Sequence, residues 1–193
     1  MQQVYFATTN KGKINSVSSS LKRYDIEVVQ VHLDIPEPRS DDLQEIAKEK
    51  VLFAYDHIKK PAIAQDAGFY IHSCNGFPGA FVNLALNTIG IPGLLKLVDG
   101  EPRGCEFRNC LAYLDSSLKE PVYFESSVKG TLSEQPRGEK GEHFWSDLSF
   151  IFVPEGETKT LAEMGMDEYQ EWREVRLRDS FSSKFAEWFS MRK

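Results

Sequence analysis

The stretch that decides the fold is residues 60–79, which read KPAIAQDAGFYIHSCNGFPG. Its apolar run Ala62-Ile63-Ala64 follows a proline and is typical of a short buried strand, whose carboxyl end would present Asp66. Open α/β sheets bind their ligands at that edge. We therefore predict that Asp66 is a catalytic or metal-binding carboxylate. A helix-capping or turn aspartate is the equal alternative.

Small residues follow this carboxylate. Ala67 and Gly68 would let the backbone pass close to a ligand, and residues 75–79 (NGFPG) are typical of a turn. The stretch therefore predicts a strand, a ligand-contacting segment and a turn in that order.

Length and composition indicate one globular domain over residues 1–193. Hydrophobic residues make up 41% of the chain and aromatic residues 12%, enough for a proper core. No apolar run approaches the roughly 18 residues of a membrane span, and the N-terminus lacks a signal-peptide charge pattern. Three cysteines, an odd number, suit reduced thiols. We expect a soluble, cytoplasmic protein without a membrane partner.

The charge balance disfavours one class of partner. The formal net charge is −6, and no basic stripe follows the sequence. Binding to nucleic acid depends on neutralising phosphates along the backbone, so we expect no nucleic-acid partner. A few local cations could still hold a small anionic ligand.

The N-terminal segment has the order strand, polar loop, helix. Residues 4–7 are apolar, and Ile14, Val17 and Leu21 recur at helical spacing after the loop. A helix N-terminus that follows a loop offers free backbone N–H groups to an anion. The loop residues able to hydrogen-bond a phosphate are Thr8, Asn10 and Lys13. The loop is not a Walker A sequence, and a solvated polar loop is the alternative interpretation.

A second acid lies one strand and one helix earlier than Asp66. Residues 27–31 predict a strand, and Glu37 lies in the proline-containing loop that follows. Asp41 is expected to cap the next helix, which ends before Pro61. Glu37 and Asp66 could then converge at one sheet edge, although an exposed loop glutamate is the alternative.

The second half of the chain predicts more strands and a C-terminal helix. Residues 84–97 indicate two short helices joined by a turn at 90–93, and residues 105–114 and 121–130 alternate as two half-buried strands of a mixed sheet. Residues 149–153 indicate another strand, and residues 167–191 one helix that docks on the sheet. Phe144 and Trp145 could stack on a planar ligand, with a satellite core as the commoner alternative.

Several segments, in order, resemble signatures of the inosine triphosphate pyrophosphatase family, also called XTP/dITP diphosphatases. Residues 6–13 (FATTNKGK) resemble its T-x-N-x-x-K opening, residues 34–37 (DIPE) its L-P-E loop, and residues 66–69 (DAGF) its D-S-G-L element. Residues 75–79 resemble its G-x-P-G turn, and residues 154–164 (PEGETKTLAEM) its P-x-G and T-x-A-E-M signatures. Together these segments cover most of the chain.

The resemblance implies an elongated, two-lobed α/β fold around a central mixed β-sheet, with a cleft between the lobes, and a homodimer. It also implies Mg²⁺-dependent hydrolysis of non-canonical purine nucleoside triphosphates (ITP, dITP, XTP) to the monophosphate and pyrophosphate. Carried over to this sequence, Thr8, Asn10 and Lys13 hold the triphosphate, while Glu37 and Asp66 ligate Mg²⁺. Asp66 also activates the attacking water, and Lys13 adds electrostatic stabilisation.

The sequence departs from the family pattern around the aspartate and at the base-contacting end. Gln65 and Ala67 replace an acid and a hydroxyl residue, and the K-N-x-x-S-H-R segment that recognises the purine is absent. The aromatic loop reads FWSDLSF, so that either Asp147 or Ser149 occupies its aspartate position. Two arginines that could replace the lost base-contacting cation, or that could simply be solvated, are Arg173 and Arg176.

These departures leave two alternatives to the implied activity. One is a pyrophosphatase for other modified nucleotides. The other is a catalytically weak or inactive relative that binds nucleotides.

Overall fold

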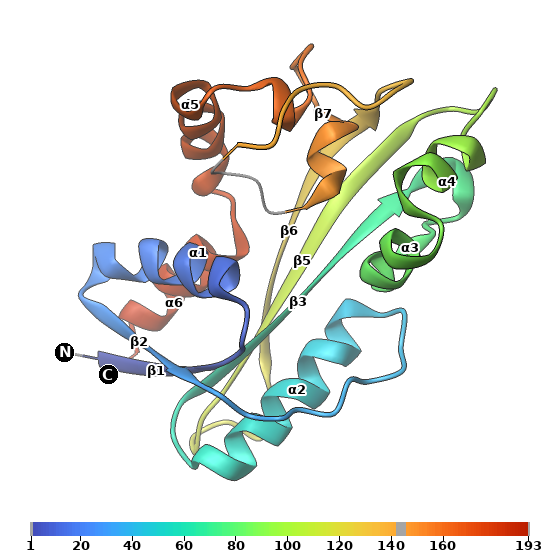
Figure 1. Ribbon diagram of the computed structural model, residues 1–193. Helices are drawn as coiled ribbons and strands as arrows, with labels where there is room; N and C mark the ends of the chain where they lie inside the picture. The colour runs from blue at the N-terminus through green and yellow to red at the C-terminus, as the bar shows by residue number, and fades with distance from the viewer. Residues whose placement is uncertain (1, 142–145, 193) are drawn as a thin grey trace. The chain divides into compact units, whose positions relative to one another are not determined.

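The structure, a computed structural model, describes residues 2–141 and 146–192. Strands and helices alternate through the first half of the chain, and paired strands and further helices make up the second half (Figure 1). The strands are β1 (Gln2–Ala7), β2 (Ile26–Val31), β3 (Ala62–Ile71), β4 (Pro78–Gly79), β5 (Gly104–Leu114), β6 (Val122–Leu132) and β7 (Phe152–Pro154). The α-helices are α1 (Lys11–Leu21), α2 (Leu43–Ile58), α3 (Val82–Thr88), α4 (Gly90–Leu97), α5 (Met166–Leu177) and α6 (Phe181–Ser190).

The strands form one mixed sheet with the order β2-β1-β3-β5-β6-β7, and β4 pairs with β3 off this path. β1 is parallel to both β2 and β3, with Tyr5 opposite Ala62, whereas β4 is antiparallel to β3 and β7 is antiparallel to β6. The predicted α/β fold with a mixed central sheet is therefore confirmed.

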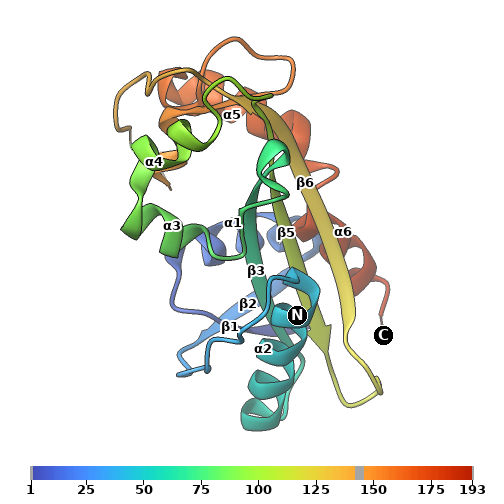
Figure 2. The ribbon, with the colours of Figure 1, turned by 90° about the vertical axis from the view of Figure 1, so that its right-hand side faces the viewer.

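The chain divides into two compact units, and β3, β5 and β6 each continue from one unit into the other. The first unit comprises residues 1–67, 109–126 and 178–193, and the second comprises residues 68–108 and 127–177. Both views of the ribbon show these three strands as the longest of the sheet (Figure 2).

The first unit has its core between the sheet and the helices α1 and α6. Period-two alternation sends Ile63 of β3 into this core, together with Leu21 of α1 and Phe185 of α6, all fully buried. Phe185 lies among the rings of Tyr113, Phe124 and Phe189, at centroid distances of 5.6, 5.4 and 5.3 Å. Helix α2 buries an apolar stripe of its own and contacts β1.

The second unit has a separate core. Phe69 of β3, Phe107 of β5 and Phe152 of β7 form a cluster of rings. The ring centroid of Phe107 lies 4.7 Å from that of Phe69 and 4.8 Å from that of Phe152. Leu94 of α4 and Leu161 close this core from the helical segments. No helix in the described residues is long and apolar enough to cross a membrane.

Three predicted elements are wrong in detail. The predicted C-terminal helix breaks at residues 178–180, where Ser180 caps α6 through its side chain, so Leu177 belongs to α5. Residues 147–150 form a 3₁₀ turn, and the strand there is the shorter β7. The cap of α2 is Asp42 rather than Asp41, because the Asp42 carboxylate accepts from the Gln44 N–H at 2.8 Å.

One smaller detail also differs, and the cysteines agree with the expectation. The predicted turn at 90–93 is confined to Gly90, which has φ +64°, and Pro92-Gly93 lie inside α4. The expected reduced thiols are found as free cysteines at positions 74, 105 and 110.

Candidate functional site

Asp66 lies within a strand rather than at its end. β3 runs ten residues, through Ile71, so the predicted strand of residues 62–64 was too short. The parallel neighbour β1 ends at Ala7, and it pairs with β3 through Tyr5 with Ala62 and Phe6 with Ile63. Asp66 therefore lies beyond the carboxyl end of β1, which is where the sheet-edge argument expects a ligand.

The loop between β1 and α1 is shaped by its own polar side chains. The Thr8 hydroxyl accepts a hydrogen bond from the Asn10 N–H at 3.1 Å, and the Asn10 side chain accepts from the Lys13 N–H at 3.1 Å. Asn10 is thus the N-cap of α1. These bonds hold the loop at the positive end of the helix dipole, where an anion is favoured.

Two lysines and two carboxylates meet beside this helix end. The Lys50 Nζ donates to Asp66 Oδ1 and to Glu37 Oε1, both at 2.8 Å. The Lys13 Nζ donates to the Gln65 backbone oxygen at 2.8 Å and lies 3.8 Å from Asp66 Oδ1. The predicted convergence of Glu37 and Asp66 therefore occurs through the ammonium of Lys50.

Burial differs sharply across this cluster. The side chains of Asp66 and Lys50 are 11% and 13% exposed, whereas that of Glu37 is 78% exposed. Asp66 is therefore fixed inside the protein, and Glu37 reaches in from a solvated loop.

The two lysines have opposite shifts of pKa. Burial lowers the pKa of Lys13 below its ordinary value, although the charge of Asp66 opposes that effect. Burial also acts to lower the pKa of Lys50, but hydrogen bonds and charge attraction from Asp66 and Glu37 outweigh it, so the pKa of Lys50 is raised. Lys50 is the more firmly charged of the two.

Lys50 is the site residue that the sequence argument missed. It lies four residues after Ile46 and three after Ala47, both buried, and four before the buried Ala54. This spacing places Lys50 along the apolar stripe of α2. A lysine at a buried position of a helix indicates a nearby carboxylate or other anion, because a buried ammonium needs an anionic partner. This spacing could have identified Lys50 from the sequence.

The donor set suits a magnesium ion. Magnesium is usually bound by one or two carboxylates together with phosphate oxygens and waters. Glu37 and Asp66 already share one positively charged partner, the Lys50 ammonium, so their oxygens converge on a cation position. In the described residues, no group of three or more His, Cys, Asp or Glu side chains offers an all-protein metal site.

The residues that flank Asp66 have structural partners. Gln65 is 7% exposed, and its amide donates to Asn109 Oδ1 at 3.0 Å. A Cβ added to Gly68 would lie 2.7 Å from the Gly79 carbonyl oxygen, so this glycine is needed for the close approach of β4. Ala67 is half-buried between them.

The residues predicted to contact a base belong to the second unit. Asp147 is exposed at the start of a 3₁₀ turn, whereas Ser149 is buried. Arg176 donates to the backbone oxygens of Glu155 and Trp172 at 2.9 and 3.3 Å, and Arg173 is half-buried on the same helix. Phe144 and Trp145 lie outside the described residues.

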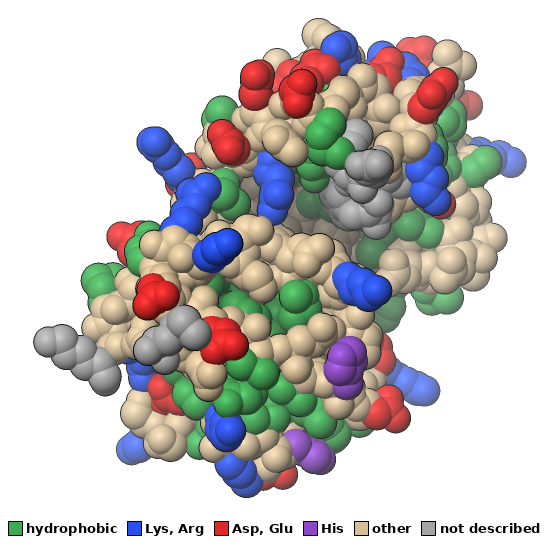
Figure 3. All heavy atoms as spheres, turned by 60° about the vertical axis from the view of Figure 1, so that its left-hand side comes forward, with side chains coloured by type: hydrophobic (Ala, Val, Ile, Leu, Met, Phe, Trp, Pro, Cys, Tyr) green, Lys and Arg blue, Asp and Glu red, His purple; other side chains and the backbone are tan. Residues whose placement is uncertain are grey.

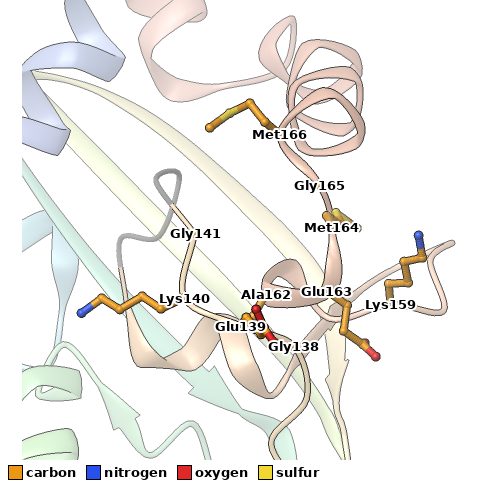
Figure 4. A pocket seen from close by; sticks show the side chains of 10 residues that line it. All are labelled: Gly138, Glu139, Lys140, Gly141, Lys159, Ala162, Glu163, Met164, Gly165 and Met166. Carbon is orange, nitrogen blue, oxygen red and sulfur yellow. The ribbon is translucent and has the colours of Figure 1, made fainter.

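The second unit also has a surface cavity of about 750 Å³, lined by residues 138–141, 162–166 and Lys159 (Figure 4). Glu163 of the T-L-A-E-M segment closes a capping box with Thr160 and lies 3.4 Å from Arg137. The close-up shows Lys140 and Lys159 pointing away from each other. Among the described residues, neither Asp147 nor the two arginines of α5 line this cavity.

Known proteins resemble this chain over nearly its whole length. A dITP/XTP pyrophosphatase of Methanopyrus kandleri is 40% identical over 188 residues, which cover 97% of this chain and 96% of the relative. A dITP/XTP pyrophosphatase of Saccharolobus solfataricus is 34% identical, with 93% and 90% covered. A HAM1 protein from Coxiella burnetii shares the fold with a TM-score of 0.82 at 20% identity, and both chains are covered in full. The model of the Ham1 family matches residues 4–177, and the chain therefore belongs to the Ham1 family.

Proposed function

We propose that this protein hydrolyses non-canonical purine nucleoside triphosphates (dITP, XTP and ITP) to the nucleoside monophosphate and pyrophosphate. The observation that carries the proposal is the buried carboxylate of Asp66, held between Lys13 and Lys50 beside the N-terminus of α1. The relatives named dITP/XTP pyrophosphatase, which match nearly the whole chain, support the substrate class.

The residues of the first unit divide into an anion-binding part and an acidic part. Lys13 and the capped end of α1, with Thr8 and Asn10, would hold the triphosphate. Asp66 would accept the proton of the attacking water as the phosphoanhydride bond to the released pyrophosphate breaks. Lys50, once free of its carboxylates, would add a second ammonium against the developing negative charge.

Magnesium is the cofactor that this donor set supports, with Glu37 and Asp66 as its protein ligands. When bound, it would neutralise phosphate charge and orient the reacting groups. The remaining contributions come from the protein, because Asp66 is already fixed by its burial and its two lysines.

The candidates for base recognition are those that the family resemblance implies. Phe144 and Trp145 would stack on the purine, and Asp147, Arg173 and Arg176 are the polar candidates for its edge. Asp147 is preferred over Ser149 because its side chain is exposed, whereas that of Ser149 is buried. Arg176 would have to give up its contacts with Glu155 and Trp172.

We also propose a homodimer and a cytoplasmic location. Apolar side chains are exposed on and around α3 and α4, with Phe81, Leu84 and Leu97 at 45%, 61% and 46%. Exposed apolar patches of this kind are typical of protein interfaces. The free cysteines suit a reducing compartment. Acidic and basic side chains are interspersed on the face drawn in Figure 3, which does not favour a nucleic-acid partner.

Product analysis tests the proposed reaction. Wild-type protein and Asp66→Asn would be incubated with dITP and Mg²⁺, and the products separated by ion-exchange chromatography. We expect equal amounts of dIMP and pyrophosphate from the wild type and almost none from the variant. Formation of dIDP and phosphate would refute the reaction type, and nucleotide binding without turnover would favour an inactive relative.

A further inference from the structure

The cation position between Glu37 and Asp66 is filled by a side chain of the protein itself. Lys50 is within 2.8 Å of one oxygen of each carboxylate, and its side chain is only 13% exposed. We propose that Lys50 is a placeholder cation that keeps free divalent metal out of this site until a nucleotide arrives. This inference rests on the proposed function, since it concerns how that site is loaded.

Lys50 and a metal ion would need the same carboxylates. Magnesium binds carboxylate oxygens at about 2.0–2.1 Å. A metal held by Glu37 and Asp66 would compete with the Lys50 ammonium, which contacts Glu37 Oε1 and Asp66 Oδ1. The ammonium and the ion cannot occupy that position together. Lys50 must move before the metal can bind.

Without a nucleotide, two lysines balance two carboxylates, and the cluster is neutral. A bare divalent ion would displace the Lys50 ammonium. The ammonium groups of Lys50 and Lys13 would then both lie close to a new positive charge, next to the buried Asp66. Like charges at this range repel strongly when water is partly excluded.

A triphosphate removes that penalty. Its negative charges give both ammonium groups new partners, because Lys13 already lies at the anion-binding end of α1. The metal would then enter as its complex with the nucleotide. The fold thus couples release of Lys50 to arrival of substrate.

The inference makes an uncommon prediction, namely that loss of a site lysine tightens metal binding. Free Mn²⁺ would be titrated into the nucleotide-free protein and its signal followed by electron paramagnetic resonance. We expect Lys50→Met to bind Mn²⁺ at least about ten-fold more tightly than the wild type, because one neutralising charge is gone. The matched control is Lys48→Met on the same helix, whose partner Glu120 is exposed, and it should leave Mn²⁺ affinity unchanged.

Further variants keep the test decisive if Lys50→Met folds poorly by circular dichroism. Lys50→Gln should show the same gain, and Lys13→Met a smaller one, because its ammonium is 3.8 Å from Asp66. Adding Asp66→Asn to the Lys50 variant should remove the gain. Folded Lys50 variants that bind Mn²⁺ no better than the wild type would overturn the inference. That result would leave the proposed function standing if the wild type still releases pyrophosphate.

Discussion

Asp66→Asn tests the balance of charges at the site through stability. The Asp66 side chain is 11% exposed and contacts Lys50 at 2.8 Å and Lys13 at 3.8 Å. Breaking a buried ion pair by removing one partner typically costs about 3–5 kcal/mol. Asparagine still offers Lys50 a side-chain oxygen, and Lys50 also retains its ion pair with the exposed Glu37. We therefore expect a loss of unfolding free energy at the lower end of this range, about 3 kcal/mol.

Urea unfolding followed by tryptophan fluorescence measures this loss directly. A decrease of about 3 kcal/mol corresponds to a folding equilibrium lower by about a hundred-fold. Asp56→Asn is the control, because the Asp56–Lys59 pair is exposed on both sides, and we expect no measurable change in its unfolding free energy. An unfolding free energy of Asp66→Asn within about 0.5 kcal/mol of the wild-type value would show that the ion pairs of Asp66 with Lys13 and Lys50 do not stabilise the protein.

Other predictions address the core, a glycine, the thiols and the interface. Phe185→Ala should lower the unfolding free energy by about 3–5 kcal/mol, because Phe185 is fully buried among aromatic rings; a loss below about 1 kcal/mol would contradict this packing. Gly138→Ala should lower the melting temperature, since its φ is +88° and its Cβ would lie 2.3 Å from Ala162 backbone atoms; an unchanged melting temperature would show that the segment relaxes freely. Burial raises the pKa of Cys105 and Cys110 to about 12, so both thiols are protonated at pH 8 and should resist iodoacetamide in the native protein, as mass spectrometry can show; rapid labelling of either would be inconsistent with their burial. Leu84→Glu should convert a dimer to a monomer in light scattering, and a dimer that persists would place the interface elsewhere.

The sequence predicted the secondary-structure elements around the site better than the contacts within it. Short apolar runs identified β1 and β2, and helical spacing identified α1 and α2. The resemblance to the XTP/dITP diphosphatases is confirmed by the Ham1 family match and the relatives. Asp66 was expected at the end of a short apolar strand, but β3 continues through polar residues because β4 pairs with Phe69 and Tyr70. The hydrophobicity pattern of residues 62–71 alone does not indicate which strands pair with β3.

Tertiary contacts explain the other differences. Lys50 was missed because a lysine on a helix is usually solvated, and its two carboxylates lie 13 and 16 residues away in the chain. The break between α5 and α6 comes at Ser180, whose side chain accepts from the Ser183 N–H, while the helical spacing of Leu177, Phe181 and Phe185 continues across it. Gly68 was expected to let a ligand approach the backbone, and the structure adds a second close approach, that of the Gly79 backbone.

The central claim is that the triphosphate site serves non-canonical purines. The most direct measurement is kcat/KM for pyrophosphate release with Mg²⁺, for dITP and XTP against dGTP and ATP. We predict values at least about a hundred-fold higher for dITP and XTP, because a site that hydrogen-bonds a distinguishing group discriminates strongly. Equal values for all four nucleotides, or release only from other nucleotides, would contradict the proposed substrate. No release from any of them would contradict the enzymatic function itself.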